Sequence, residues 1–220
     1  MKRIGLITIG QSPRVDVVPD IKVVLGDVEV IECGALDDLS EIEIGALIPR
    51  EGEYILVTRL RDGTEVKVSR EKIIPLMQKC IDRLEQVADV ISLLCTGDFP
   101  ELRSKKILIE PSKLLLNIVS TFNIKKLGVI VPDPRQVDTV VKRWYRVVED
   151  VVIDSFSPYT GDIKKLPEIA KRFSDRDLIV LDCIGYNIEV KRIVMGIAKK
   201  PVVLPRTILA RILRELTEVV

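Results

Sequence analysis

The sequence of 220 residues contains no histidine. This absence excludes a Ser-His-Asp triad, a cysteine–histidine pair and a zinc site with imidazole ligands. The four cysteines, at positions 33, 80, 95 and 183, show no Cys-x-x-Cys spacing, so a local thiolate metal site is not expected. No phosphate-binding loop or Gly-x-Gly-x-x-Gly motif is present, so no nucleotide cofactor is implied. We therefore expect neither a metal nor a cofactor, and proton chemistry must come from thiols, carboxylates, lysine or tyrosine.

The chain also lacks a charge surplus and a long apolar run. Its 34 Lys and Arg residues balance 33 Asp and Glu residues, which gives a net charge of +1. We therefore expect neither nucleic acid nor a membrane surface as a partner. No uncharged apolar run approaches the ~18 residues of a membrane span, and the first apolar run, residues 4–9, is too short for a signal peptide. These features predict a cytoplasmic protein with four free thiols.

Side-chain amides are scarce as well. They occur only at Gln11, Gln78, Gln86, Gln136, Asn117, Asn123 and Asn187, beside abundant Ile, Val, Lys, Arg and Glu. This usage resembles that of thermophile proteins and says nothing about function.

Two segments of the chain repeat one pattern. Residues 88–97 align without gaps on residues 176–185, and each copy reads Asp, an apolar run, Cys, one residue and Gly. Such an apolar run is typical of a buried strand of a parallel sheet, and ligands bind outside the carboxyl ends of these strands. The pattern therefore predicts Cys95 and Cys183 as a catalytic pair of thiols from two similar halves. In the alternative interpretation, each cysteine is a small apolar core residue.

Strand and helix patterns alternate along the chain, which predicts an α/β protein. We expect two similar flavodoxin-like halves with parallel sheets, related by a pseudo-twofold axis, over residues 1–109 and 110–205. The helix of residues 206–220 is expected to pack back on the first half. Asp62-Gly63, between two β-rich runs, predicts a β-hairpin inserted in the first half. Ser12-Pro13 predicts a helix that begins there and runs to about Leu25, with Ser12 as N-cap.

Several short motifs resemble those of the AroM-like proteins over nearly the whole chain. They are Thr8-Ile9-Gly10-Gln11-Ser12-Pro13-Arg14 with Asp16, Val68-Ser69-Arg70, Glu110-Pro111-Ser112, Val129-Ile130-Val131-Pro132 and Leu181-Asp182-Cys183-Ile184-Gly185-Tyr186. More distantly, the arrangement is similar to the aspartate/glutamate racemase superfamily. That resemblance implies two α/β halves, one cysteine from each, a substrate in the cleft between them and no cofactor.

The chain departs from the racemase pattern at three places. Ile184 and Gly185 follow the second cysteine, where racemases usually have Thr and then His or Glu. Thr96-Gly97-Asp98 follows the first cysteine in place of Asn-Thr, and a different loop, residues 10–14, replaces the Gly-rich first loop. The groups that hold the substrate therefore differ, and the resemblance does not identify the substrate.

Arg14 is the predicted ligand of a substrate carboxylate, because it stands just after the first strand at an expected helix start. In the alternative interpretation it is an exposed first-turn arginine. The other predicted substrate contacts lie at strand ends or in the loops that follow them: Thr8, Gly10, Gln11, Ser12, Thr96, Gly97, Asp98, Pro132 and Gly185.

Together these features predict a cofactor-independent racemase or isomerase of a small, amino-acid-like carboxylate, with Cys95 and Cys183 as the acid/base pair. Two alternatives stay open: an isomerase or decarboxylase that uses Cys183 alone, and a protein that binds a small anion without turnover. A homodimer is expected from its general frequency. Trp144 and Tyr145, flanked by basic residues, are interpreted as a helix face for a partner.

Overall fold

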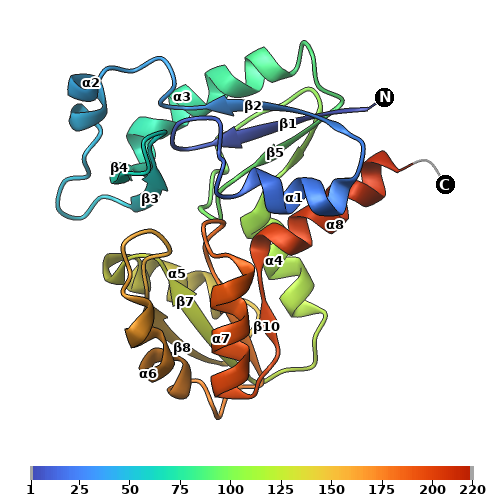
Figure 1. The fold of residues 1–220 in the computed structure, drawn as a ribbon. Helices are drawn as coiled ribbons and strands as arrows, with labels where there is room; N and C mark the ends of the chain where they lie inside the picture. Colours follow the sequence, from blue (N-terminus) through green and yellow to red (C-terminus); the bar gives the residue numbers. More distant parts are fainter. Residues whose placement is uncertain (1, 219–220) are drawn as a thin grey trace. The chain divides into compact units, whose positions relative to one another are not determined.

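Two four-stranded parallel sheets with the same strand order organise the chain. Their orders are β2-β1-β5-β6 and β8-β7-β9-β10, so β1 corresponds to β7, β2 to β8, β5 to β9 and β6 to β10. Figure 1 labels β1, β2 and β5 of the first sheet and β7, β8 and β10 of the second. This order is that of the first four strands of a flavodoxin-like sheet. The predicted α/β class with two similar parallel halves is confirmed.

The structure is a computed structural model and describes residues 2–218. It divides into two units, one with the chain up to Ser112 and the segment from Leu209 onward, the other with Lys113–Ile208. The last two residues of the helix expected over 206–220 lie outside the described residues. Of the described helices, none is long and apolar enough to cross a membrane.

The first unit begins with β1 (Arg3–Thr8), α1 (Val18–Leu25), β2 (Glu29–Gly34), α2 (Glu41–Ala46), β3 (Ile55–Arg59), β4 (Glu65–Ser69), α3 (Arg70–Leu84), β5 (Val90–Leu93) and β6 (Ile107–Ile109). Helix α4 (Pro111–Ser120) crosses into the second unit, which continues with β7 (Lys126–Val131), α5 (Val137–Trp144), β8 (Asp150–Ser155), α6 (Leu166–Lys171), β9 (Leu178–Leu181), α7 (Ile188–Ala198) and β10 (Val202–Val203). Helix α8 (Pro205–Thr217) returns to the first unit. Short 3-10 helices, Pro134–Gln136 and Ile163–Lys165, precede α5 and α6.

The aspartate that opens each repeat has the same structural role. Asp89 accepts a hydrogen bond from the backbone N–H of Arg3 at 2.8 Å, and Asp177 accepts from Lys126 at 2.9 Å. Each carboxylate thus binds the first residue of the central strand, β1 or β7. The repeated aspartate therefore holds the start of β5 beside β1, and the start of β9 beside β7.

A glycine at the same register position of β1 and β7 lets a helical segment approach the sheet closely. Gly5 lies opposite Ile91, and Gly128 lies opposite Ile179. A Cβ on Gly5 would come within 3.1 Å of the Leu84 side chain, and one on Gly128 within 2.5 Å of Phe173. A side chain at either position would force the helical segment away from the sheet.

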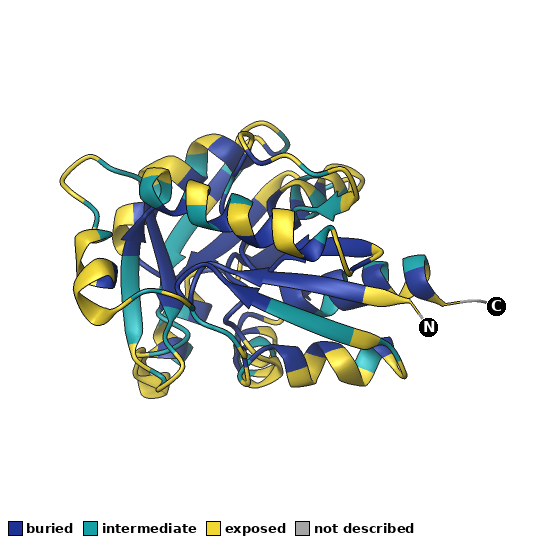
Figure 2. Ribbon diagram, turned by 90° about the horizontal axis from the view of Figure 1, so that it is seen from above, coloured by how far each residue is buried: buried dark blue, intermediate teal, exposed yellow. Residues whose placement is uncertain are grey.

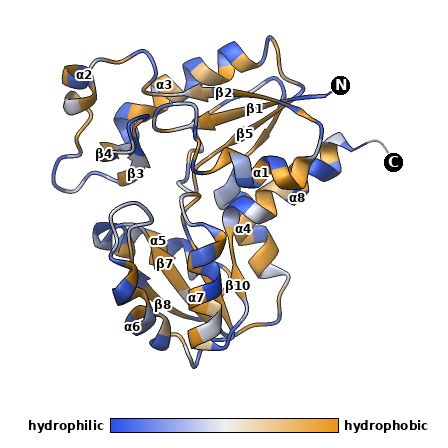
Figure 3. Cartoon of the chain, in the orientation of Figure 1, coloured by the Kyte–Doolittle hydropathy of each residue, from blue (hydrophilic) through white to orange (hydrophobic). Residues whose placement is uncertain are grey.

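Both faces of the second sheet are buried, which explains its uninterrupted apolar strands. Leu127, Val129 and Val131 pack with Trp144 on one face, while Ile130 packs with Phe173 on the other. Figure 2 shows the strands largely as buried, and Figure 3 shows β1, β5 and β7 as apolar. Because Trp144 is fully buried, the interpretation of this tryptophan as part of a face for a partner is wrong.

The helix predicted to begin at Ser12-Pro13 begins later. Helix α1 starts at Val18, with Pro19 in its first turn, and the Ser12–Pro13 peptide bond is cis. The Ser12 hydroxyl does not cap a helix but donates to the carboxylate of Asp37 at 2.6 Å. A side-chain contact 25 residues away thus overrides the local helix signal.

The predicted hairpin is confirmed, and it belongs to the first unit alone among the described residues. Strands β3 and β4 pair antiparallel, and Gly63 in the turn between them has a φ of 100°, which favours glycine. Ahead of the hairpin lies α2, a helix that the sequence interpretation missed. Its signal was the capping box in which Ser40 and Glu43 bind each other's backbone N–H groups.

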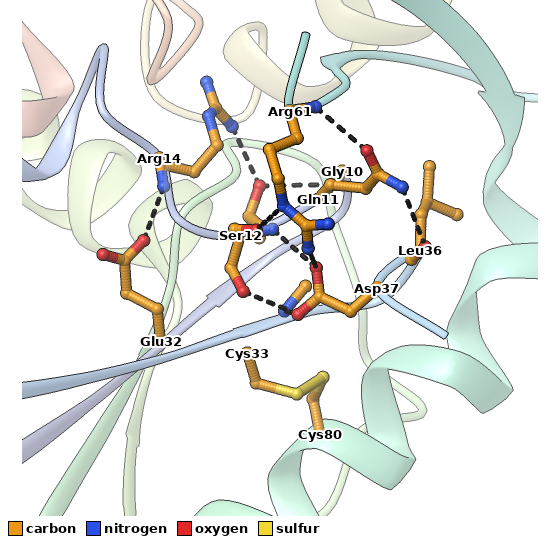
Figure 4. A network of polar contacts seen from close by, with 12 residues as sticks. Gly10, Gln11, Ser12, Arg14, Glu32, Cys33, Leu36, Asp37, Arg61 and Cys80 are labelled. Atoms are coloured by element: carbon orange, nitrogen blue, oxygen red, sulfur yellow. Dashed lines mark hydrogen bonds and ion pairs between the residues drawn. A yellow bond between two sulfur atoms is a disulfide. The ribbon is translucent and has the colours of Figure 1, made fainter. Parts of the chain in front are cut away.

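The expectation of four free thiols is wrong for two cysteines. Cys33, at the end of β2, and Cys80, in α3, form a disulfide within the first core (Figure 4). Their sequence separation of 47 residues gave no local signal. Cys95 and Cys183 remain free thiols.

Thiol counting tests this pairing. Unfolded without reductant, the protein should expose two reactive thiols, and after reduction it should expose four. A disulfide that closes a loop of this length restricts the unfolded chain by about 4 kcal/mol in the chain-entropy model. Reduction should therefore lower the free energy of unfolding by an amount of that order, measured by denaturant titration. Four reactive thiols in the unreduced protein would contradict the pairing.

Candidate functional site

The two cysteines outside the disulfide occupy equivalent positions, just past the ends of the corresponding strands β5 and β9. Cys95 lies two residues past β5, and Cys183 lies two residues past β9. The residue before each cysteine still donates its N–H to the central strand: Leu94 to the carbonyl of Ile7, and Asp182 to that of Ile130. Each thiol therefore stands at the carboxyl edge of its sheet, where open α/β sheets bind ligands.

Each sulfur accepts a hydrogen bond from the backbone N–H two residues later. The N–H of Gly97 lies 3.2 Å from Cys95 Sγ, and that of Gly185 lies 3.4 Å from Cys183 Sγ. An N–H that donates to sulfur stabilises the thiolate more than the thiol. The glycine of each repeat thus has a direct role, since its backbone turns back toward the sulfur.

The surroundings of Cys183 include a buried tyrosine. The Tyr186 hydroxyl donates to the carbonyl of Phe156 at 2.5 Å. Burial raises the pKa of Tyr186 well above its ordinary value, and the nearby charge of Cys183 adds to that effect. Tyr186 is therefore a neutral phenol beside the sulfur.

Two further side chains shape the loop that follows Cys183. A Cβ on Gly185 would lie 2.5 Å from the hydroxyl oxygen of Tyr159, so this tyrosine packs directly on the glycine. Arg206, 1 % exposed, donates to the carbonyls of Ile184 and Gly185 at 3.1 and 2.8 Å. The sequence interpretation gave neither Tyr159 nor Tyr186 a role, although Tyr186 follows Gly185 directly.

A buried ion pair fixes the residue before Cys183. Asp182 accepts hydrogen bonds from the guanidinium of Arg143 and from Trp144 Nε1, the latter at 2.9 Å. Arg143 and Trp144 end helix α5, so this carboxylate joins the end of that helix to the end of β9. The cysteine is therefore held from both sides along the chain, by the ion pair of Asp182 directly before it and by the Gly185 N–H two residues after it.

In the first unit, the Asp37 carboxylate holds the loop that follows β1. It accepts from the N–H and the hydroxyl of Ser12 at 2.7 and 2.6 Å, and from the N–H of Gly34 at 2.8 Å. A Cβ on Gly34 would lie 2.6 Å from the Ser12 nitrogen, so only glycine permits this approach. Figure 4 shows that the Cys33–Cys80 disulfide lies beside this network, next to Gly34 in sequence.

The hairpin turn also contacts this loop. The N–H of Arg61 donates to Gln11 Oε1 at 3.0 Å, and its guanidinium donates to the Ser12 carbonyl at 2.7 Å (Figure 4). The same guanidinium lies 3.3 Å from Asp37. The insertion therefore takes part in shaping the loop that carries the predicted contacts Gln11 and Ser12.

Arg14 is neither exposed nor at a helix start. Its side chain is 2 % exposed and forms a bidentate pair with Asp16, both bonds at 2.8 Å, and it also donates to the Thr8 hydroxyl at 2.8 Å. Its backbone N–H donates to Glu32 at 2.7 Å. Burial alone raises the pKa of Asp16, but the hydrogen bond and charge of Arg14 together outweigh this effect, so the pKa lies below its ordinary value.

The remaining predicted residues lie at the same two edges. Thr96 and Gly97 are buried beside Cys95, and the Asp98 carbonyl accepts from Arg70 Nε at 2.5 Å. Pro132 is buried directly after β7, next to β9 in its sheet. Thus each unit gathers its own predicted residues at one edge of one sheet. Among the described residues, no group of Cys, Asp and Glu could hold a metal ion.

Solved structures with a similar fold include two amino-acid racemases and a maleate isomerase. Aspartate racemase from Picrophilus torridus aligns with a TM-score of 0.63 at 16% identity, over 98% of this chain and 94% of that one. The maleate isomerase Iso from Pseudomonas putida S16 has a TM-score of 0.63 at 15% identity, over 98% and 92%. Glutamate racemase from Aquifex pyrophilus has a TM-score of 0.61 at 16% identity, over 98% and 84%. At these identities, the likeness establishes a racemase-like fold.

The sequence itself assigns the chain to a narrower group. A profile described as AroM protein matches residues 4–217, so the chain belongs to the AroM family. Among curated proteins, no sequence matches it significantly.

The role of Asp37 can be tested against its neighbour. Asp37→Ala removes the acceptor of three hydrogen bonds that converge on the loop, so we expect a loss of about 3 kcal/mol in unfolding free energy. Asp38→Ala removes an exposed ion pair with Arg83 and should cost less than about 0.5 kcal/mol. Denaturant titration of both variants measures the difference, and equal losses would contradict the special role of Asp37.

The pair of Arg14 and Asp16 should make stability depend on pH. Because the pKa of Asp16 is lower in the folded than in the unfolded state, its contribution is present above about pH 4 and is lost as the pH falls through the folded value. Asp16→Asn should remove this part of the acid dependence. The free energy of unfolding is measured from about 2 pH units below to about 2 pH units above pH 4. The exposed Asp27→Asn serves as control and should keep the wild-type slope. An unchanged slope in Asp16→Asn would refute this assignment.

Proposed function

We propose that the chain is a cofactor-independent racemase or isomerase of a small, amino-acid-like carboxylate, with Cys95 and Cys183 as its acid/base pair. The observation that carries the proposal is the matched N–H···S geometry at equivalent edges of the two sheets. One buried cysteine at a strand end is ordinary, but two with the same donor at the same place favour a shared chemical role. The racemase-like fold is consistent with this role.

In the proposed reaction, one thiolate removes the proton from the carbon next to the substrate carboxylate. The C–H bond breaks, its electron pair stays on that carbon, and a new S–H bond forms. The second cysteine, as a thiol, donates its proton to the opposite face of the same carbon and becomes the thiolate. A free thiol has a pKa near 8.5, so one thiol and one thiolate coexist readily near neutral pH.

The substrate carboxylate is proposed to bind the loops at the carboxyl edges. Candidate contacts are the side chains of Gln11, Ser12 and Thr96, and the loop residues Thr8, Gly10, Gly97, Asp98, Pro132 and Gly185. Among these, Pro132 has no N–H to donate, and the Ser12 hydroxyl already donates to Asp37. The N–H groups of Gly97 and Gly185 already donate to the two sulfurs. Direct binding by Arg14 would require its pair with Asp16 to open. Within the proposal, Arg14 therefore acts mainly by holding the shape of the loop after β1.

An alternative proposal keeps only Cys183 as the proton donor of an isomerase or decarboxylase. The observation that favours it is the buried phenol of Tyr186 near Cys183. The aligned position after Cys95 is Asp98, so the first repeat has no such phenol. A further alternative is a binding protein for a small anion, which retains the fold without turnover.

We also propose that the protein acts in the cytoplasm of a thermophile. Disulfides are rare in cytosolic proteins of mesophiles but common in intracellular proteins of hyperthermophiles. The Cys33–Cys80 disulfide and the scarcity of side-chain amides together fit that setting.

Deuterium incorporation tests the proposal. The protein is incubated in heavy water with a panel of amino and dicarboxylic acids, including both enantiomers of aspartate and glutamate, and exchange at the carbon next to the carboxylate is followed by NMR. Cys95→Ala and Cys183→Ala should each abolish conversion to the opposite enantiomer or isomer, since each removes one of the two proton-transfer groups. The Cys33→Ala/Cys80→Ala double variant controls for cysteine replacement and should retain exchange while it stays folded.

The outcomes separate the three functions. Loss of activity in Cys183→Ala alone would support the single-cysteine enzyme and contradict the two-thiol proposal. Binding of a small anion without exchange, unchanged in both variants, would support the binding protein. No binding and no exchange with any member of the panel would overturn the proposed substrate class.

A further inference from the structure

Strand β3 of the inserted hairpin packs against both loops of the first-unit site. A Cβ on Gly10, in the loop after β1, would lie 2.3 Å from the Arg59 carbonyl and 2.5 Å from the Thr58 hydroxyl oxygen. A Cβ on Gly97, after β5, would lie 2.9 Å from the Leu56 side chain. Gly10 and Gly97, both predicted to contact substrate, thus allow β3 to approach the loops after β1 and β5. Because Gly10 has no side chain, the Thr58 hydroxyl lies directly against the loop after β1.

Thr58 is unusual among the polar residues of this region. It is 1 % exposed, and its hydroxyl has no hydrogen-bond partner among the described residues. Leaving a buried hydroxyl unpaired costs about 1–3 kcal/mol. Valine has nearly the same shape without this cost, so stability alone would favour valine at position 58.

We propose that Thr58 is a further substrate-binding residue, whose hydroxyl donates a hydrogen bond to a carboxylate oxygen of the ligand at the Gly10–Ser12 loop. The inference rests on the proposed function and adds a specificity contact to it. A carboxylate oxygen only accepts hydrogen bonds, and the unpaired hydroxyl offers the donor that it needs. Among the described residues, only the first unit has the hairpin. The loop after β1 would therefore have this contact, and the loop after β7 would lack it.

Access to Thr58 requires a small shift of the hairpin. The backbone contact that holds β3 to the loop, from the Gln11 N–H to the Arg59 carbonyl, is long at 3.3 Å. The other polar contacts come from Arg61, whose side chain is 56% exposed: its N–H donates to Gln11 Oε1, and its guanidinium donates to the Ser12 carbonyl and pairs with Asp37. These contacts can yield to a ligand that supplies its own hydrogen bonds, while β3 keeps its pairing with β4.

Two substitutions at one position test the inference. Thr58→Val keeps the shape and removes the hydroxyl, whereas Thr58→Ser keeps the hydroxyl. The dissociation constant for the tightest-binding member of a panel of malonate, succinate, maleate, aspartate and glutamate is measured by calorimetry, and the unfolding midpoint by thermal denaturation. We expect Thr58→Val to weaken binding at least tenfold with an equal or higher midpoint, and Thr58→Ser to stay within about threefold of wild type.

Each other result overturns the inference. Wild-type affinity in Thr58→Val would show that the hydroxyl makes no ligand contact, while the proposed function would stand. Weaker binding with a lowered midpoint in Thr58→Val would assign the hydroxyl a structural partner instead. If the wild-type protein binds no member of the panel, the proposed substrate class fails and the inference falls with it.

Discussion

The hydrogen bond from a glycine N–H to a cysteine sulfur two residues earlier is the interaction on which the proposed chemistry depends. It occurs in each unit, with N···S distances of 3.2 and 3.4 Å. The rest of each repeat positions this contact: the aspartate fixes the start of the strand, the apolar run buries it, and the cysteine emerges where the sheet ends. A donor aimed at sulfur stabilises a thiolate without a histidine, which this chain lacks.

Around this shared core the two units differ. In the second unit, Tyr186 and Arg206 lie at the loop after the cysteine, and Asp182 joins it to the end of α5. In the first unit, Asp37 and the hairpin shape the neighbouring loop after β1. Such unequal surroundings suit the proposed reaction, because they would give the two chemically similar thiols different roles.

Much of the fold could be predicted because its signals are local. Apolar runs identified the strands, Asp62-Gly63 identified the hairpin, and the repeat identified the two cysteines. The errors arose where contacts between distant residues prevail. Ser12 forms a hydrogen bond with Asp37 instead of capping a helix, and Cys33 forms a disulfide with Cys80, 47 positions later. The missed helix α2 is different, since the capping box of Ser40 and Glu43 that begins it was present in the sequence.

The candidate site followed from sequence only in part. Placing Cys95 and Cys183 at sheet edges needed the strand pattern alone, whereas the pairing of Arg14 with Asp16 depends on burial that no local pattern reports. The hydroxyl of Thr58 meets Gly10 only because the hairpin folds back over the sheet edge. Residues brought together by an insertion carry no periodic signal, so a single sequence could not reveal them.

The claim that one substrate is served by two thiols can be tested by bridging them. A short dialkylating reagent such as 1,3-dibromoacetone, added to the unreduced folded protein, should join the peptides of Cys95 and Cys183 within one chain, as seen by mass spectrometry of the digest. We expect this bridge at one reagent per chain, with the Cys33–Cys80 disulfide intact. Separate alkylation of each thiol without a bridge, or no reaction until the protein unfolds, would contradict it.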